Sequence, residues 1–135
     1  MPRQVVVGVI RVAAGILRDG LGRVLISERT GDPAFSGLWE FPGGKIGDGE
    51  EPVAALGREL DEELGIEILE QSFFMRIDHD YPDRSVRIDF YLVGRWHNTP
   101  RGRDGQALKW IKPVELSEDL LLPADGPALA ALQRL

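Results

Sequence analysis

The chain has 135 residues, which suits a single domain, residues 1–135, with its own hydrophobic core. The formal net charge of -6 excludes an extended surface for a nucleic-acid polymer, because phosphate backbones bind basic surfaces. The chain has no cysteine, which excludes disulfides and thiolate metal ligands and suits a reducing cytoplasm. No apolar stretch approaches the roughly 20 residues of a membrane-spanning helix, so a membrane is not an expected partner. Because of the net charge, a nucleic-acid polymer is not an expected partner either.

The first third of the chain predicts strands that are separated by turns and loops. Val- and Ile-rich or alternating segments are the expected strands: residues 4–17, 23–29 and 38–41. Gly, Pro, Asp and Ser gather between them in the expected turns and loops: residues 19–22, 30–37 and 42–51.

A helix is predicted from Pro52 to Leu64. Proline is well tolerated in the first turn of a helix. Val53, Leu56, Leu60 and Leu64 recur at helical spacing and form one apolar stripe, and Gly65 ends the pattern.

Strands and a final helix follow in the second half of the chain. The expected strands are residues 73–81, 85–96 and 108–111, of which the first two form a hairpin around Pro82-Asp83-Arg84. Residues 97–106 read as a loop rich in Gly, Pro and Arg, and residues 127–135 read as a helix. This order predicts an α/β fold, an α/β/α sandwich around a central mixed sheet.

The predicted helix gathers carboxylates on one face. At about 100° per residue, Glu62 and Glu63 fall on either side of Glu59, away from the leucine stripe. Such acids repel one another, and most lie in the C-terminal half of the helix, where its dipole disfavours anions. One interpretation is a solvated acidic face that Arg58 partly offsets. The other is a site for a hard cation such as Mg²⁺, which prefers carboxylate oxygens.

The spacing of residues 44–66 favours the metal site. The pattern is Gly, five residues, Glu, seven residues, Arg-Glu-aliphatic, one residue, Glu-Glu, one residue, and Gly-aliphatic. Its members are Gly44, Glu50, Arg58, Glu59, Leu60, Glu62, Glu63, Gly65 and Ile66. This is the Nudix box without a mismatch. The chain resembles Nudix hydrolases over essentially its whole length, and those of the MutT type most closely, through the further segments LWEFPGGK, YPDR and FYLVGRW.

The resemblance implies a hydrolase of phosphoanhydride bonds. MutT-type enzymes convert nucleoside triphosphates to the monophosphate and pyrophosphate, and 8-oxo-dGTP is their signature substrate. The expected role is therefore sanitation of the nucleotide pool, which avoids mutations during DNA replication.

The resemblance also implies which residues bind Mg²⁺, for which Mn²⁺ can substitute. The expected ligands are Gly43 through its carbonyl, Glu59, Glu62, Glu63 and the late-loop acid Asp104. Asp104 stands where MutT has Glu, and its alternative role is that of an ordinary loop acid. Glu59 is the expected group that orients or deprotonates the water, with Glu62 as the alternative, and Arg58 is expected to brace a carboxylate. Glu50 is expected to orient the box through hydrogen bonds.

The expected substrate-binding residues are Arg29, Phe41, Gly44, Lys45, Arg84 and Asp125. Plain core packing is the alternative for Phe41, and a surface position is the alternative for Lys45 and Arg84. MutT has Asn where this chain has Asp125. Ionised Asp only accepts hydrogen bonds, so it would repel O6 of 8-oxoguanine but could accept from the exocyclic amine of cytosine. The alternative is a buried Asp that keeps its proton, and some Nudix enzymes active on oxidised purines use Asp in this pocket.

Three other functions therefore remain open at this point. The first is a Nudix pyrophosphohydrolase for CTP or modified pyrimidine triphosphates, whose members carry a similar Pro-Ala-Asp triplet. The second is a non-catalytic Nudix-fold binding module, which the intact box disfavours. The third is a hydrolase of dinucleoside polyphosphates or ADP-ribose, which the MutT-like segments outside the box disfavour. The sequence leaves open whether the protein is a monomer or a dimer, and whether the native chain continues past Leu135.

Overall fold

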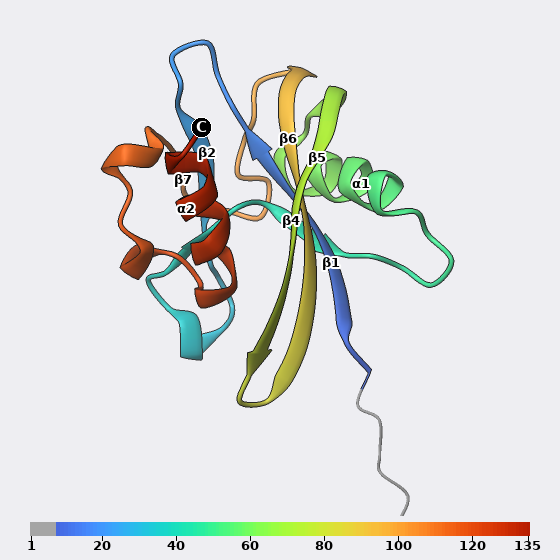
Figure 1. The fold of residues 1–135 in the computed structure, drawn as a ribbon. Helices are drawn as coiled ribbons and strands as arrows, with labels where there is room; N and C mark the ends of the chain where they lie inside the picture. Colours follow the sequence, from blue (N-terminus) through green and yellow to red (C-terminus); the bar gives the residue numbers. More distant parts are fainter. Residues whose placement is uncertain (1–7) are drawn as a thin grey trace, which may run out of the picture.

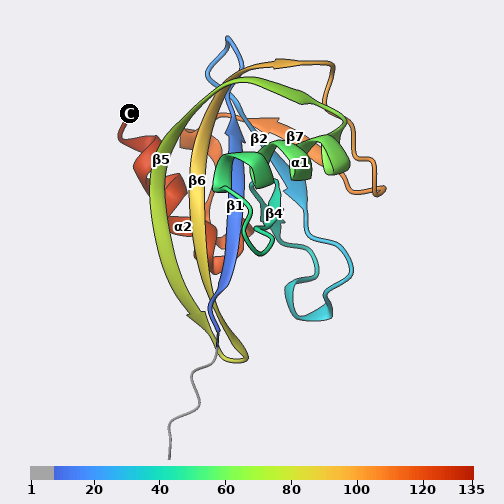
Figure 2. The same ribbon diagram turned by 90° about the vertical axis from the view of Figure 1, so that its right-hand side faces the viewer.

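Two β-sheets form the centre of the fold, as a computed structural model that describes residues 8–135 shows (Figures 1 and 2). The larger sheet has the strand order β4-β1-β6-β5. Its strands are β1 (Ile10–Leu17), β4 (Gly43–Lys45), β5 (Glu67–Tyr81) and β6 (Arg84–His97). The central pair β1–β6 is parallel and both outer pairs are antiparallel, so the sheet is mixed.

The smaller sheet is antiparallel and has the order β3-β2-β7. Its strands are β2 (Val24–Glu28), β3 (Trp39–Glu40) and β7 (Leu108–Ile111). Because β3 and β4 are separated only by Phe41 and Pro42, the chain passes from one sheet to the other at this point.

The two α-helices lie on opposite sides of the larger sheet (Figure 1). On one side, α1 (Pro52–Leu64) buries Leu56, Leu60 and Leu64 against Ala13 and Leu17 of β1. On the other side, α2 (Gly126–Gln133) packs over the neighbouring residues of β1, which point the opposite way because side chains alternate along a strand. The predicted α/β/α sandwich around a mixed sheet is confirmed.

The C-terminal region reaches α2 through short 3₁₀ helices. They are η2 (Pro113–Glu115), η3 (Glu118–Leu120) and η4 (Pro123–Asp125), and an earlier one, η1 (Pro33–Phe35), lies in the loop after β2. The segment η4 leads directly into α2, which carries Asp125 into the interior of the molecule.

Some element boundaries differ from the sequence prediction. The first strand begins at Ile10, and the predicted residues 4–7 lie outside the described part of the chain. The strand β5 begins six residues earlier than predicted, at Glu67 instead of residue 73, because its mostly exposed first residues lack the apolar alternation of a half-buried strand. The Gly-rich segment that was predicted to stop a strand pairs with β1 as β4. Val53 at the start of α1 is 43% exposed, although it belongs to the predicted apolar stripe.

Candidate active site

The Glu59 and Glu63 side chains of α1 lie where this helix packs on the edge strand β4. The helix ends at Gly65, which adopts a left-handed φ of 71° and donates its N–H to Asp61 O. A Cβ atom at position 44 would overlap the Glu59 carboxylate, so that carboxylate lies directly against the backbone of β4. Glycine at position 44 therefore makes room for a charged group beside the sheet edge.

Arg58 connects several acidic residues of the predicted site. Its Nε and Nη2 atoms each donate to the Glu50 carboxylate at 2.9 Å, and its Nη1 donates to Glu59 Oε1 at 2.9 Å. The Nη2 atom also donates to Lys45 O at 3.0 Å. The Arg58 guanidinium, aided by the Gly47 N–H, holds the pKa of Glu50 at about 2, so Glu50 stays ionised.

Negative charge accumulates around Glu63. The pKa of Glu63 is raised to about 8, mainly by burial and also by the charges of Glu59, Glu40 and Asp104, against a backbone hydrogen bond from Gly43 that lowers it. These acids come from α1, β3 and the loop after β6. Carboxylates are the oxygen donors that a hard divalent cation prefers, so the chemistry of these residues suits such an ion.

The carboxylates are not all equally close. Glu62 lies 3.7 Å from Arg58 and its side chain is 61% exposed. Within residues 8–135, no three Asp, Glu, His or Cys side chains converge tightly enough to enclose an ion by themselves. A divalent ion held by only one or two of these carboxylates would need water and substrate phosphates to complete its coordination.

A cavity of about 310 Å³ lies across β4 from the acidic helix face. Its floor is formed by β1 and β6 residues on the side of the sheet opposite α1. Every substrate-binding residue predicted from the sequence lines it: Arg29, Phe41, Gly44, Lys45, Arg84 and Asp125. Gly43 lines it as well, so β4 separates the acidic face from the cavity.

Asp125 is the deepest polar group of this cavity and is only 4% exposed. Its Oδ2 atom accepts a hydrogen bond of 2.9 Å from Phe41 N–H. Burial raises the pKa of Asp125 to about 8; the charge of Glu40 also raises it, whereas the Phe41 hydrogen bond and Arg29 lower it. A pKa raised in this direction favours the neutral carboxylic acid, which has one donor and one acceptor oxygen, over the carboxylate.

Glu40 and Tyr81 also line the cavity, and neither was predicted from the sequence to belong to the site. Glu40 accepts hydrogen bonds from Arg29 Nη1 at 3.2 and 3.3 Å. Tyr81 accepts a hydrogen bond of 3.1 Å from Ala124 N–H. Glu40 belongs to the segment LWEFPGGK and Tyr81 to YPDR. Their place in these MutT-like segments is the sequence signal that could have identified them.

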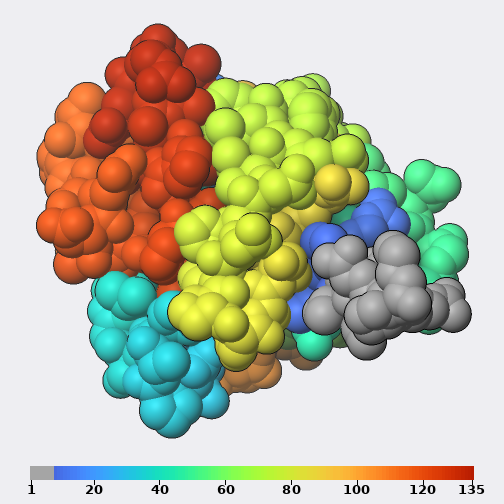
Figure 3. Space-filling model, turned by 60° about the horizontal axis from the view of Figure 1, so that its bottom comes forward, coloured from blue at the N-terminus to red at the C-terminus, as the bar shows by residue number. Residues whose placement is uncertain are grey.

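Arg84 joins the cavity to the loop after β2. Its guanidinium lies 5.2 Å from the Tyr81 ring centre and 5.7 Å from that of Phe35, and 3.9 Å from Asp32. The loop and the tip of the β5–β6 hairpin consequently lie side by side, as the cyan and yellow atoms in Figure 3 show. Arg84 is thus a cavity residue that also closes one wall.

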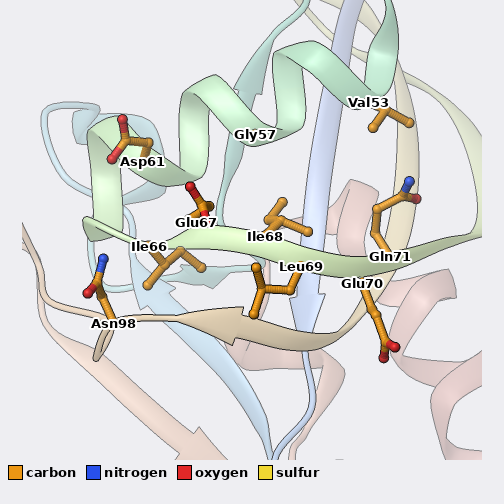
Figure 4. A pocket seen from close by; sticks show the side chains of 10 residues that line it. All are labelled: Val53, Gly57, Asp61, Ile66, Glu67, Ile68, Leu69, Glu70, Gln71 and Asn98. Carbon is orange, nitrogen blue, oxygen red and sulfur yellow. The ribbon is translucent and has the colours of Figure 1, made fainter.

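A second, more open groove of about 770 Å³ lies between α1 and the edge strand β5 (Figure 4). It is lined by residues of the outer side of α1, including Gly57 and Asp61, and by the first residues of β5. None of Glu59, Glu62 and Glu63 lines it. The larger groove is therefore separate from the acidic site.

The fold and the site define a class of protein: a mixed α/β fold in which an acidic helix packs on a glycine-rich edge strand beside a cavity, as expected of a hydrolase of phosphoanhydride bonds. The chain belongs to the Nudix family, since the family model described as NUDIX domain matches residues 13–131. Members of this family act on small-molecule nucleotides and generally need a divalent metal ion. No helix among residues 8–135 is long and apolar enough to cross a membrane.

Named relatives are similar over nearly the whole chain. The 8-oxo-dGTP diphosphatase of Escherichia coli (strain K12) is 40% identical over 93% of this chain and 98% of its own. The CTP pyrophosphohydrolase of the same organism is 38% identical over 92% of this chain and 90% of its own.

Solved structures agree with the fold. The solution structure of the E. coli ORF135 protein superimposes with a TM-score of 0.83 at 35% identity, covering 94% of this chain and 90% of that one. A structure of MutT, from work on Aliivibrio salmonicida and Vibrio cholerae, gives 0.79 at 35% identity, covering 93% and 97%. The resemblance to MutT-type Nudix hydrolases is thereby confirmed.

Proposed function

We propose that the protein is a nucleoside triphosphate pyrophosphohydrolase that acts on 8-oxo-dGTP and releases 8-oxo-dGMP and pyrophosphate. One domain, residues 1–135, would carry this activity. The role would be to remove an oxidised precursor from the nucleotide pool before DNA replication, and the cytoplasm of a bacterium is where that pool lies. A relative that is 40% identical over nearly its entire length and named 8-oxo-dGTP diphosphatase supports this choice.

The burial of Asp125 in the cavity, where it is 4% exposed, is the observation that carries the choice of base. MutT has Asn at this position, and an ionised Asp would repel O6 of the base. A buried Asp with a pKa of about 8 keeps its proton at neutral pH. It can then donate to O6 and accept from N7–H of 8-oxoguanine, as an Asn side chain does.

The remaining cavity groups suit a flat, polar base. The volume of about 310 Å³ is at the lower end of the range of roughly 300–1,000 Å³ found for ligand sites. The Phe41 ring would pack against the base, while it also contacts Phe90 edge-on. Arg29 has a buried Nε without a hydrogen-bond partner among residues 8–135, so this N–H could donate to a bound nucleotide. Arg84 would close the cavity beside Tyr81.

The triphosphate would cross β4 from the cavity to the acidic helix face. Gly44 offers backbone without a side chain there, and the exposed Lys45 would neutralise phosphate charge. The residues that would hold Mg²⁺, or Mn²⁺ in its place, are Glu59, Glu62, Glu63, Asp104 and the carbonyl of Gly43. When bound, the divalent ion supplies positive charge between phosphates and carboxylates and acidifies the attacking water.

Glu59 would orient the water and accept its proton, and Glu62 is the alternative base. The water oxygen would bond to the β-phosphorus while the bond from that phosphorus to the α–β bridging oxygen breaks. The nucleoside monophosphate leaves, and the water oxygen ends in pyrophosphate. Arg58 would keep Glu59 in place through the hydrogen bond of 2.9 Å.

A substrate panel tests this proposal. We would measure kcat/KM with Mg²⁺ for 8-oxo-dGTP, dGTP, CTP, dCTP and 5-substituted dCTP at neutral pH. We expect 8-oxo-dGTP to be preferred over dGTP by at least about 100-fold, since a site built to hydrogen-bond a group discriminates strongly against its absence. A ratio near one would overturn the assignment of the substrate.

A CTP or modified pyrimidine pyrophosphohydrolase is the second candidate. It is favoured by the CTP pyrophosphohydrolase that is 38% identical to this chain, and by the capacity of an ionised Asp125 to accept from the cytosine amine. A preference for cytidine nucleotides in the same panel would establish it. Failure to hydrolyse any nucleotide would instead favour a binding module.

A further inference from the structure

The loop after β6 covers the C-terminal end of α1. The last carbonyl groups of a helix have no partner within the helix and need donors from elsewhere. Here the N–H groups of Arg101 and Arg103 donate to Leu64 O at 2.9 Å and to Glu63 O at 3.1 Å. The Arg103 side chain donates to Asp61 O at 2.9 Å. The loop is therefore fastened to the helix that carries the acidic residues.

Gln106 makes a different kind of contact, because its side chain joins the helix and the loop acid. Its Nε2 donates to Glu63 O at 3.2 Å, and its Oε1 accepts from Asp104 N–H at 2.9 Å. One planar carboxamide thus links the backbones of Glu63 and Asp104. Gly102 allows this arrangement, since a Cβ atom there would overlap Gln106 O.

Asp104 has little else to fix it. Its side chain is exposed and makes no hydrogen bond or ion pair with the residues between 8 and 135. Its neighbour Gly105 has a φ of 80°, which closes a turn back to Gly102. The neighbouring Arg103 N–H holds the loop to Glu63 O, and the Gln106 carboxamide adds the side-chain link that ties the Asp104 backbone to the same carbonyl.

We propose that Gln106 is a positioning residue, whose carboxamide sets the late-loop acid Asp104 beside Glu63 so that both face the same divalent ion. The inference rests on the proposed function in that it takes Asp104 as a metal-binding residue. Groups that orient metal ligands typically change metal affinity by about 10- to 100-fold when they are removed.

Three variants and a control test this inference. Gln106→Met removes both hydrogen bonds without adding charge, Asp104→Asn removes the carboxylate, and the double variant combines them. The control is Arg103→Met, which removes another hydrogen bond between the same loop and the same helix end but leaves the carboxamide link intact. For each protein we would measure Mn²⁺ binding to the nucleotide-free protein by calorimetry, the Mg²⁺ concentration at half-maximal rate, and the unfolding temperature.

We expect Gln106→Met to weaken Mn²⁺ binding by about 10-fold and to raise the half-saturating Mg²⁺ concentration similarly, with kcat at saturating Mg²⁺ less affected. The double variant should bind Mn²⁺ no more weakly than Asp104→Asn alone, because both changes remove the same contribution of the Asp104 carboxylate to metal binding. Arg103→Met should lower the unfolding temperature and leave metal binding unchanged.

Other outcomes would overturn the inference. Additive losses in the double variant, or an equal loss of metal binding in Arg103→Met, would mean that Gln106 acts only by stabilising the loop. Mn²⁺ binding that is unchanged in Gln106→Met would contradict it directly. Since Mn²⁺ binding is read without nucleotide, these results stand apart from the substrate panel, whose failure would overturn the proposed function instead.

Discussion

Arg58 holds the acidic side chains of the site in place. It holds Glu50 and Glu59 at the same time, from opposite ends of one guanidinium. A planar group with several fixed donors can do this, whereas a lysine ammonium would act as a single point charge. Glu59 is therefore oriented by the protein before any metal ion or nucleotide binds.

Glu59→Gln should reduce kcat by at least about 100-fold, because the amide can neither accept the proton of the water nor bind a hard cation well. The fold should be intact, as judged by an unchanged circular dichroism spectrum. Asp61→Asn is the matched control on the same helix, since Asp61 faces the separate groove (Figure 4), and it should retain nearly full activity. Near-normal turnover in Glu59→Gln would remove Glu59 from the mechanism.

Asp125 should make substrate choice depend on pH. With a pKa of about 8, its neutral carboxyl would donate to O6 of the proposed substrate at lower pH, whereas the ionised group at higher pH can only accept. The ratio of kcat/KM for 8-oxo-dGTP to that for CTP is therefore expected to fall between pH 7 and pH 9. The other groups that face Asp125 are Arg29, Glu40 and Tyr81.

Asp125→Asn provides the comparison for this effect, because Asn has a donor and an acceptor at every pH. It should behave like the wild type at pH 7 and keep a constant ratio up to pH 9. If the ratio falls equally in both proteins, titration of the nucleotide rather than of Asp125 is the cause.

At the scale of elements, the sequence predicted both ends of α1 correctly but did not predict every residue of the site. Periodic leucines and the punctuating Pro52 and Gly65 are local signals, and they fixed both helix ends. Glu40 and Tyr81 carry no such signal, because they meet only when β3 and the end of β5 are brought together by the fold. The same holds for Gln106, whose contacts with Glu63 join distant segments.

The strand β4 was missed for a related reason. Glycine has a low intrinsic preference for strands, so Gly43 and Gly44 indicated a stop. In the structure both are needed in a strand, because a side chain at either position would overlap the Ala13 backbone or the Glu59 carboxylate. Here the need for space beside the backbone of β1 and the Glu59 carboxylate outweighs the low preference of glycine for strands.

Gly43→Ala and Gly57→Ala should have opposite effects on stability. Gly43→Ala forces a methyl group into the β1 backbone and should lower the free energy of unfolding by about 1–3 kcal/mol. Gly57 lies within α1, where a methyl group added to it would have nothing within 4 Å, so alanine there should raise the free energy of unfolding by about 0.5–1 kcal/mol. Denaturant titration measures both, and a destabilised Gly57→Ala would contradict this account of α1.

At the scale of the whole molecule, stability should decrease toward alkaline pH. Asp125 has an ordinary pKa of 3.8 when unfolded and about 8 when folded, so the folded state holds the extra proton between these values. Its contribution is fully present below about pH 4 and is lost as the pH rises through about 8.

The unfolding temperature of the metal-free wild type should consequently fall between pH 6 and pH 9. Asp125→Asn should show a shallower fall, since Asn does not titrate. Equal slopes in the two proteins would mean that Asp125 is not buried as a neutral acid.

The parallel pairing of β1 with β6 has a consequence for how the chain acquires this fold. Ile10 pairs with Val86, so the larger sheet cannot close until β6, which ends at His97, has left the ribosome. Until then the leucines of α1 lack the surface that covers them. Such distant pairing slows folding and exposes apolar segments to aggregation. A nascent chain that is stalled before β6 should remain protease-sensitive and bind chaperones, whereas release beyond His97 should bring protection of α1 and β1 together.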